Sequence, residues 1–541
     1  MKFQNPIIPG FYPDPSICRA GEDYYLVNSS FEYFPGVPLF HSRDLVHWEQ
    51  IGHCLTRRSQ LEIADGYPSV SGIFAPTIRC YNNRFYMITT NKALGTKGGG
   101  NFFVYTDDIN GEWSDPVWID FKGIDPDLFF DDDGKVFYTG AWNGIRQCEI
   151  DINTGKRLTE PRLIWTGSGA KNPEGPHLYK INGVYYLMIA EGGTSYGHMV
   201  TIARSQNPCG PFESCPRNPV LTHRGSKSEI QATGHADIIQ AHNSTWWMVC
   251  LGIRPVPYPE VHHLGRETFL APVKWDDDGW PVIGFGGEVL METEADCLPQ
   301  FSFPEKPARD NFDTEKLDPQ WNFIRNPHNE DWSLTERRGF LTLHGSHRTL
   351  EDGGSPAFAG RRLRHFNCRI STHLEFNPVN DSEEAGLTMF LNGEMTSVNS
   401  GGHHYEIALT RLDGKKFLIF RRRIGSLWKV ENTAEYSGNA VILGVQASYR
   451  EFEFYYEPVG TFNNAPPING NTQPLGQPVF FGRGETHLLS AEAGGGFTGL
   501  YAGLYATGNG RRCSAAAYFD WFDYTVTADP GMISYWDYIK C

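Results

Sequence analysis

The stretch that decides the fold is Gly175-Pro-His-Leu-Tyr-Lys-Ile-Asn-Gly-Val-Tyr-Tyr186, in which an apolar strand, a turn and an aromatic strand follow one another. Its Asn182-Gly183 pair supplies the residue types that two-residue hairpin turns favour, so the stretch is a predicted β-hairpin. Four more segments repeat this plan, each opening on a small, acidic or histidine residue that is usually followed by proline. They open at Asp14, Ala75, Asp125 and His235.

The five segments recur at a regular interval. Their second positions are 15, 76, 126, 176 and 236, so the spacings are 61, 50, 50 and 60 residues. A single small antiparallel sheet cannot bury both of its faces, whereas such sheets packed radially form a propeller whose blades cover one another. The sequence therefore predicts an all-β chain that begins with a five-bladed β-propeller. A β-sandwich with chance internal similarity is the alternative.

A second domain is predicted after the repeats end. The repeat pattern stops after Leu290, and three prolines mark a polar linker near residues 298–309. Beyond it, short alternating segments such as Phe452-Glu-Phe-Tyr-Tyr456 are separated by Gly- and Asn-rich turns, which is typical of an antiparallel β-sandwich. We expect a propeller over residues 1–300 and a sandwich over residues 309–541.

Composition narrows the classes of partner. The 541 residues carry 47 Lys and Arg against 63 Asp and Glu, a net charge of −16 that would repel nucleic acid. No run of 18 apolar residues predicts a membrane span, and 11 Cys without CxxC spacing indicate neither a disulfide framework nor a zinc site. The first residues lack the apolar core of a signal peptide, which predicts a cytoplasmic protein or a secreted one whose signal peptide is absent. The sequence leaves open whether the chain forms a homo-oligomer.

Acidic residues open several of the predicted inner strands. Asp14, the pair Asp125 and Asp127, and Glu174 lie at or beside such positions, and His235 opens the fifth. Each alone fits a structural role, because Asp before Pro commonly stabilises a turn. In a propeller, however, these strand starts meet near the central axis. Three carboxyl groups there repel one another unless one stays protonated, which is the arrangement that general acid/base hydrolysis requires.

Longer motifs run in order through nearly the whole chain. In the first part they are Asn5–Ser16, Gly123–Leu128, Glu174–Lys180, Ala190–Thr194 with His198, and Gly234–Asp237; in the second they are Ala359–Arg362, Phe497–Gly499 and Asp520–Tyr524. The first set resembles the β-xylosidases of glycoside hydrolase family 43, and the second resembles the concanavalin-like jelly roll appended to them. The resemblance implies the same all-β fold, with the sandwich closing the active site.

The resemblance implies a role for each of three carboxyl groups. Asp14 would be the general base that activates water, Glu174 the general acid, and Asp127 the group that raises the pKa of the acid and orients it. Asp125 is the rival for the last role. The family inverts the anomeric centre, which needs base and acid about 6.5 to 9.5 Å apart.

Sugar-binding residues follow from the same resemblance. Those that match walls or hydroxyl-binding positions of the sugar pocket are Phe31, Phe74, Ala75, Trp142, Arg266 and the axial His235. Phe74 stands where the family usually has Trp, so the preference between xylose and arabinose is left open. Phe497 resembles the aromatic residue that the second domain inserts to close the pocket, although a glycine-rich hairpin tip that merely packs at an interface is an equal alternative.

No cofactor is required by this chemistry. Parts of the family hold a calcium ion under the axial histidine, so the resemblance leaves room for an ion near His235. The run Asp131-Asp-Asp-Gly134 lacks the twelve-residue ligand pattern of a calcium loop and is predicted to be a hairpin turn.

These features together predict an inverting exo-glycosidase. It would release D-xylose from the non-reducing end of xylobiose and short xylo-oligosaccharides, with side activity on α-L-arabinofuranosides. A dedicated α-L-arabinofuranosidase is the alternative within the enzyme class, and a non-catalytic carbohydrate-binding propeller is the alternative outside it.

Overall fold

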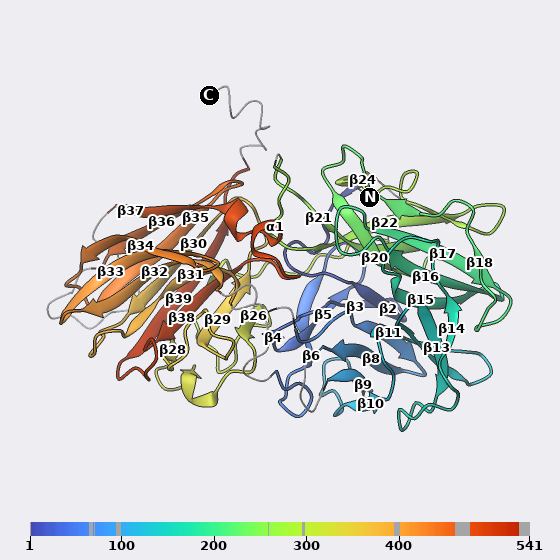
Figure 1. Cartoon of the computed structure of the whole chain (residues 1–541), viewed down its shortest axis with the longest axis horizontal. Coiled ribbons are helices and arrows are strands. Elements are labelled where there is room, and N and C mark those ends of the chain that lie inside the picture. Colours follow the sequence, from blue (N-terminus) through green and yellow to red (C-terminus); the bar gives the residue numbers. More distant parts are fainter. Residues whose placement is uncertain are drawn as a thin grey trace. The chain divides into compact units, whose positions relative to one another are not determined.

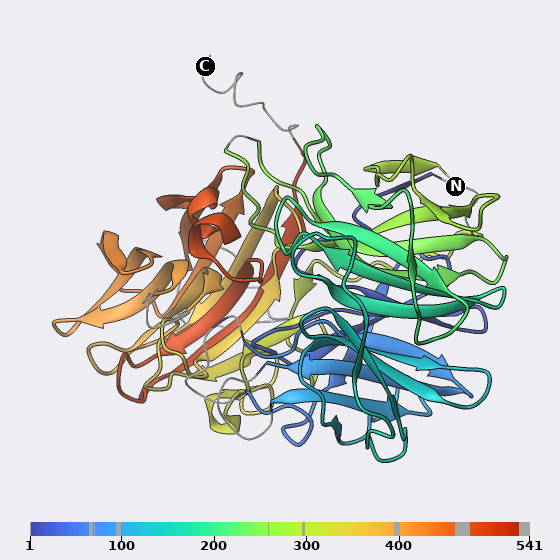
Figure 2. The same ribbon diagram turned by 45° about the vertical axis from the view of Figure 1, so that its right-hand side comes forward.

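The chain forms two compact units. In the computed structural model the described residues are 2–63, 69, 71–92, 99–257, 259–294, 298–393, 401–459 and 477–529. Unit 1 comprises residues 1–63, 71–255 and 266–304, and unit 2 comprises residues 64–70, 256–265 and 305–541. The strands of unit 1 are coloured blue to green and those of unit 2 yellow to red in Figures 1 and 2.

Unit 1 contains five antiparallel sheets of consecutive strands. From the innermost strand outward they are β2 (Ser16–Ala20), β3 (Asp23–Val27), β5 (Gly36–Ser42) and β6 (Glu49–Leu55); β7 (Thr77–Tyr81), β8 (Arg84–Asn91), β9 (Gly100–Thr106) and β10 (Val117–Ile119); β11 (Ile124–Phe130), β12 (Val136–Ala141), β13 (Ile145–Ile150) and β14 (Arg162–Trp165); β15 (Glu174–Ile181), β16 (Val184–Glu191), β17 (Met199–Ser205) and β18 (Glu213–Ser214), with β19 (Leu221–Thr222) also on β17; and β20 (Gln231–Gln240), β21 (Trp246–Ile253), β22 (Glu267–Trp275) and β23 (Pro281–Ile283).

The innermost strands close a ring. Contacts run from β2 to β7, β11, β15 and β20 and back to β2, so the predicted five-bladed propeller is confirmed. The short β1 (Lys2–Gln4) pairs with β24 (Glu292–Glu294), and β4 (Tyr33–Phe34) lies between β3 and β5 in sequence. In the hairpin predicted first, Ile181 pairs with Val184, and Asn182 and Gly183 take the positive φ values of 51° and 81° that such a turn needs.

The core of unit 1 lies between blades. Five apolar clusters each draw on two neighbouring sheets, as where Ile78 and Met87 of the second blade pack with Val27 and Leu39 of the first. The remaining clusters join the second and third, third and fourth, fourth and fifth, and fifth and first blades. Because every blade needs a neighbour to cover its face, the ring positions the strand starts at the axis.

Unit 2 is a β-sandwich of two antiparallel sheets. One follows the order β27 (Trp332–Ser333), β28 (Leu341–His344), β39 (Ala516–Val526), β30 (Cys368–Glu375), β35 (Ala440–Ala447), β36 (Glu451–Pro458) and β37 (Val479–Glu485), with β25 (Arg309–Asp310) on β39; the other follows β34 (Leu427–Glu435), β33 (Lys415–Ile424), β32 (His403–Leu412), β31 (Glu384–Asn392), β38 (Tyr501–Thr507), β29 (Ala357–Arg362) and β26 (Trp321–Ile324). The helical turns are η1 (Asn329–Asp331), η2 (Thr486–Leu489) and α1 (Ala491–Gly494). Every residue of β31 is buried.

Two short segments from between propeller strands belong to unit 2. Residues 64–70 lie between β6 and β7 in sequence, and residues 256–265 lie between β21 and β22. His262 Nδ1 is 2.7 Å from Glu492 Oε1, and the backbone N–H of Leu500 donates to the carbonyl of His263 at 3.1 Å. These bonds fix the chain just ahead of Arg266.

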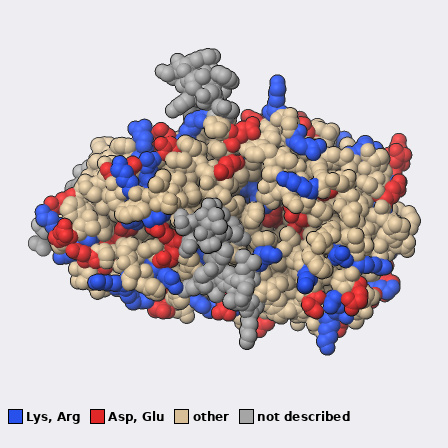
Figure 3. Space-filling view, in the orientation of Figure 1, with Lys and Arg blue, Asp and Glu red and all other residues tan. Residues whose placement is uncertain are grey.

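The nine cysteines among the described residues are all free thiols. No helix in the described ranges is long and apolar enough to cross a membrane. On the face drawn in Figure 3, acidic and basic side chains are interspersed.

Candidate active site

The strand starts at the axis share an unusual backbone. Asp14, Asp125, Gly175 and His235 have φ values of 52°, 55°, 57° and 43°, in the left-handed region that L residues seldom adopt. Irregular strand pairing follows at once in three blades, between positions 124 and 127, 174 and 177, and 234 and 237. Such irregularities re-aim side chains, and strained residues gather at functional sites.

Asp14 is held as an anion. Arg266 Nη1 donates to its Oδ1 at 2.8 Å, and the Ser29 hydroxyl donates to its Oδ2 at 2.5 Å. Burial alone would raise the pKa of Asp14, but Arg266 and, to a smaller extent, His235 outweigh burial and lower that pKa below its ordinary value. Asp14 is therefore ionised at neutral pH, as a general base must be.

Glu174 holds its proton unusually well. Burial, followed by the negative charge of Asp14, raises the pKa of Glu174 to about 7, against the opposing effect of Arg266. A carboxylic acid with this pKa is substantially protonated at neutral pH, so it can donate a proton in the same pocket where Asp14 accepts one.

Asp125 belongs to the same group. Burial raises its pKa well above the ordinary value, and the charges of Glu174 and Asp14 raise it further. The backbone N–H of Gly175, the residue after Glu174, donates to its Oδ2 at 3.2 Å. Asp125 and Glu174 thus compete for protons at one place, and neither ionises without affecting the other.

Asp127 lies elsewhere, and here the structure corrects the choice made from the sequence. Its carboxylate is fully buried and accepts two hydrogen bonds, one from Arg79 Nη2 at 2.7 Å and one from the backbone N–H of Leu178 at 2.9 Å. The irregular pairing between positions 124 and 127 of β11 separates the environments of the two aspartates. Asp125, not Asp127, is therefore the electrostatic neighbour of Glu174.

Arg79 ties the blades together below the strand starts. Its Nη1 donates to Asp237 Oδ2 at 2.8 Å on the fifth blade, and its Nη2 lies 2.9 Å from His177 Nδ1 on the fourth. The Ser16 hydroxyl of the first blade donates to the same Asp237 oxygen at 2.7 Å. Together with Asp127 of the third blade and Arg79 of the second, every blade contributes to this group, which we call the axial network.

The predicted sugar-binding residues of unit 1 fall into two places. Phe31 and Phe74 have ring centroids 5.3 Å apart, and the Arg266 guanidinium lies 5.6 Å from the Phe31 centroid. Arg266 links this group to Asp14 through its hydrogen bond of 2.8 Å. Ala75 is buried just before β7. Trp142 follows β12 and is 41% exposed, with Lys122 Nζ 5.5 Å and the Arg146 guanidinium 5.3 Å from its ring centroid.

Two histidines pack beside Asp14. His235 Nδ1 is 3.6 Å from Asp14 Oδ1, and a Cβ on Gly175 would lie 2.9 Å from His235 Nε2. Burial lowers the pKa of His235 to about 4, and burial together with His235 lowers the pKa of His198 to about 3. Both rings are therefore neutral at pH 7.

The described residues do not assemble a metal site. Across these ranges, no group of three His, Cys, Asp or Glu side chains lies close enough to hold an ion. A calcium ion near His235 stays a prediction, and no step below is routed through one.

Phe497 lies in unit 2, just after α1. It is 36% exposed and follows Gly495 and Gly496, whose φ values are 72° and 90°. Its role as a wall of the sugar pocket stays a prediction.

Several residues of the site escaped the sequence reasoning. Ser29 gave no signal, because a serine after a strand is common. Arg79 did give a signal in the sequence, because it is the charged residue within the inner strand Thr-Ile-Arg-Cys-Tyr81. A lone charge in such a strand needs buried partners of opposite sign.

Known families match both units. A sequence model of the glycosyl hydrolases family 43 matches residues 3–281, and one of the β-xylosidase C-terminal concanavalin A-like domain matches residues 309–525.

Individual relatives are similar over almost their full length. A non-reducing end α-L-arabinofuranosidase of Bacteroides ovatus is 41% identical, covering 96% of this chain and 94% of its own. A xylosidase/arabinosidase of Butyrivibrio fibrisolvens is 39% identical, covering 96% and 98%. Among solved structures, a xylan β-1,4-xylosidase from Bacillus halodurans has a TM-score of 0.87 at 34% identity, covering 97% of this chain and all of that one.

Proposed function

The chain belongs to glycosyl hydrolase family 43, and from that premise we propose that it is an inverting exo-glycosidase that releases D-xylose from the non-reducing end of xylobiose and short xylo-oligosaccharides. Side activity on α-L-arabinofuranosides is part of the proposal. One observation carries it: Asp14 with a lowered pKa and Glu174 with a pKa of about 7 interact electrostatically in one buried cluster. A non-catalytic sugar-binding propeller would have no need of such a pair.

Each carboxyl group has one step to perform. Asp14 accepts a proton from water as the water oxygen attacks the anomeric carbon, and Glu174 gives its proton to the glycosidic oxygen as that bond breaks. Arg266 and Ser29 hold the Asp14 carboxylate in place. After product leaves, Asp14 loses its proton to solvent and Glu174 regains one, which restores the starting state.

Asp125 acts through Glu174 in this scheme. Two carboxyl groups that repel each other hold their last proton more firmly than either alone. Asp125 therefore helps to keep Glu174 protonated at the pH where Asp14 is ionised.

A dedicated α-L-arabinofuranosidase is the second candidate. The activity after which the 41% identical Bacteroides relative is named favours it, and so does Phe74, since a phenyl ring leaves more room than the indole usual at that position. Turnover of the 4-nitrophenyl β-D-xyloside and α-L-arabinofuranoside by the same preparation separates the two candidates.

Hydrolysis of xylobiose followed by proton NMR tests the proposal in one experiment. We expect xylose as the only product, with the α-anomer in excess of its equilibrium share at early times. Inversion at the β-linkage releases the non-reducing-end unit as the α-anomer, whereas the reducing-end unit leaves as its existing anomeric mixture. An early excess of the β-anomer would contradict the roles of Asp14 and Glu174. Release of arabinose alone from an arabinoxylan oligosaccharide, with xylobiose untouched, would favour the second candidate.

Phe497 enters the proposal as the residue that restricts the enzyme to chain ends. We expect Phe497→Ala to weaken kcat/KM on xylobiose by about 1 to 3 kcal/mol, mostly through KM. Phe480→Ala is the matched control, because Phe480 is also an exposed phenylalanine of unit 2, at 53% exposure. Equal behaviour of the two variants would remove Phe497 from the pocket.

A further inference from the structure

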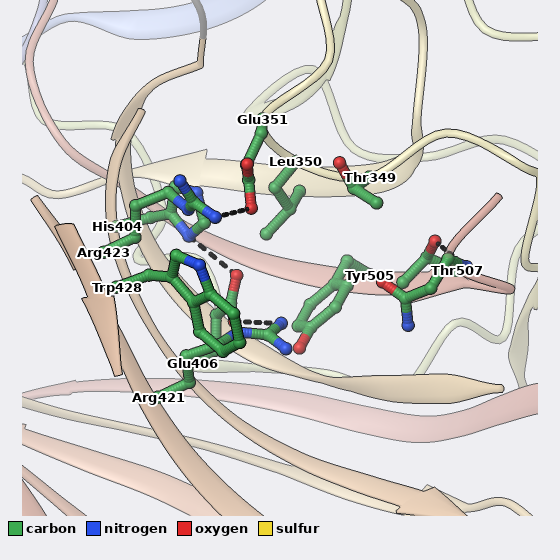
Figure 4. A pocket seen from close by; sticks show the side chains of 11 residues that line it. Thr349, Leu350, Glu351, His404, Glu406, Arg421, Arg423, Trp428, Tyr505 and Thr507 are labelled. Atoms are coloured by element: carbon green, nitrogen blue, oxygen red, sulfur yellow. Dashed lines mark hydrogen bonds and ion pairs between the residues drawn. The ribbon is translucent and has the colours of Figure 1, made fainter. Parts of the chain in front are cut away.

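The sandwich contains a pocket of its own, built on β32, β33, β34 and β38 of unit 2 (Figure 4). Its volume is about 170 Å³. Since a water molecule in the liquid occupies about 30 Å³, this is room for about five or six waters, the size of one sugar ring. Pockets for cofactors and other large ligands start at about 300 Å³.

Arginine and glutamate side chains line its floor. Arg421 Nη2 donates to Glu384 Oε1 at 2.6 Å and also pairs with Glu406. The Tyr505 hydroxyl donates to Glu384 Oε1 at 2.7 Å. These buried groups are fixed by one another before any ligand arrives, so the floor is preorganised.

His404 supplies a polar atom that the protein leaves unused. The side chain is 2% exposed, and its Nδ1 lies 2.7 Å from Glu406 Oε1, the contact drawn as a dashed line in Figure 4. Its Nε2 has no hydrogen-bond partner among the residues that the structure describes. A buried polar atom without a partner costs free energy, which a ligand hydroxyl would recover.

Trp428 provides an apolar face at the pocket. It is 59% exposed although it lines the pocket, and the Arg423 guanidinium lies 6.0 Å from its ring centroid. Figure 4 shows the indole close to His404 and to the Glu406–Arg421 pair. An exposed indole beside fixed polar groups offers one apolar face and several hydrogen-bonding edges, and sugars present the same combination.

The charges at the pocket nearly cancel. Among the residues that line it, Glu351 and Glu406 face Arg421 and Arg423; Arg423 is paired with Glu351 and Arg421 with Glu406. A strongly charged ligand would meet as much repulsion as attraction, whereas a neutral polyhydroxyl ligand can use both donors and acceptors.

We propose that this pocket binds one unit of a neutral saccharide, with the sugar ring against Trp428 and its hydroxyls toward His404 and the Arg421–Glu406 pair. This is a second carbohydrate site, made wholly of unit 2 residues, and it goes beyond the hydrolytic function. Binding here needs no catalysis, so its test is independent of the fate of the hydrolytic proposal.

Fluorine NMR on the full chain labelled with 5-fluorotryptophan tests it directly. Trp428→Phe and Trp118→Phe assign the two signals; Trp118 is the matched control, an exposed tryptophan of unit 1 at 44% exposure. Titration with D-xylose and with L-arabinose should shift the Trp428 signal saturably, with a dissociation constant of roughly 1 mM, and leave the Trp118 signal in place. No shift at Trp428, or equal shifts at both, overturns the proposal.

Two further arms assign the effect to the pocket. His404→Ala should weaken the Trp428 response about tenfold or more while hydrolysis of a nitrophenyl glycoside stays unchanged. A response retained in His404→Ala and lost in Arg266→Ala would come from the catalytic cluster and overturn the proposal. A stronger response to D-glucuronate than to D-xylose would overturn the assignment to neutral sugars.

Discussion

Two layers of side chains near the propeller axis lie only two or three residues apart along the chain, yet their charged groups have opposite surroundings. The first layer contains Asp14, Asp125, Glu174 and His235; the second is the axial network of Ser16, Arg79, Asp127, His177 and Asp237. In the first, carboxyl groups face one another, and the pKa of Glu174 is raised to about 7. In the second, Arg79 lies between two carboxylates, and the pKa of Asp237 is lowered despite the opposing effect of burial.

The difference shows that the axial network stabilises the folded propeller, whereas the carboxyl groups of the first layer destabilise it when they ionise. A carboxyl group whose pKa rises on folding makes the folded state less stable as pH rises. A carboxyl group whose pKa falls on folding makes the folded state more stable as pH rises. The axial network joins all five blades, so it can hold the strained strand starts of the layer next to it. The predictions below test this division.

The largest effect should come from Asp14→Asn, the first layer's base. It removes proton transfer from water, so kcat/KM on xylobiose should fall by about 10³-fold or more. Ser16→Ala, two residues further along the chain, is the control and should keep most of the activity while losing the hydrogen bonds of the Ser16 hydroxyl with Asp237, Arg79 and the Ile78 N–H. If both variants hydrolyse xylobiose at similar rates, the two layers do not divide as described.

Breaking the axial network should cost about 3 to 5 kcal/mol of unfolding free energy. Arg79→Met leaves Asp127 and Asp237 buried without their cation, and urea unfolding measures the loss. Because this variant can fail to fold, Tyr179→Phe gives a milder test: its hydroxyl donates to Asp237 at 2.6 Å. That variant should lose about 1 to 2 kcal/mol with kcat/KM nearly intact. Unchanged stability in both would contradict the role of the network.

The first layer should respond to substitution in the opposite direction. The pKa of Glu174 is about 7 in the folded chain and near its ordinary value when unfolded, so the folded state holds the proton more tightly. Stability therefore falls as pH rises from about 4.5 to 7. Glu174→Gln should gain about 1 to 3 kcal/mol over the parent at pH 8 and nothing at pH 4, while losing activity on xylobiose. A variant less stable than the parent at pH 8 would count against the raised pKa.

The smallest expected effect separates the two aspartates of β11. Asp125→Asn removes the carboxyl group that competes with Glu174, so the alkaline limb of kcat/KM against pH should move to lower pH. Asp127→Asn should leave the limb where it is and lower the unfolding free energy instead. A limb that moves only in Asp127→Asn would restore the assignment made from the sequence.

Much of this architecture was predictable because it repeats. Hairpins such as the one at Asn182-Gly183, spaced by 50 to 61 residues, predicted five blades, and the alternating segments after residue 310 predicted the sandwich. The acids that open the inner strands identified Asp14 and Glu174 as members of the cluster, since strand starts meet at the axis of any propeller.

The choice between Asp125 and Asp127 was not predictable by the same reasoning. In a regular strand, residues two apart lie on the same face, but β11 changes register between Ile124 and Asp127, and Asp125 has a φ of 55°. Asp127 pairs with Arg79, which lies 48 residues earlier on another blade. Neither the irregularity nor so distant a pairing leaves a local mark in the sequence.

The two segments at residues 64–70 and 256–265 bear on how such a chain could be inherited. A gene exchange that joined this propeller to a foreign sandwich at residue 305 would carry both segments along without the residues that hold them, such as Glu492 for His262. An exchange that kept each segment with its own unit would need crossover points at five places in the chain. The two halves are therefore expected to descend together as one heritable piece, although each has the size and core of a separate domain.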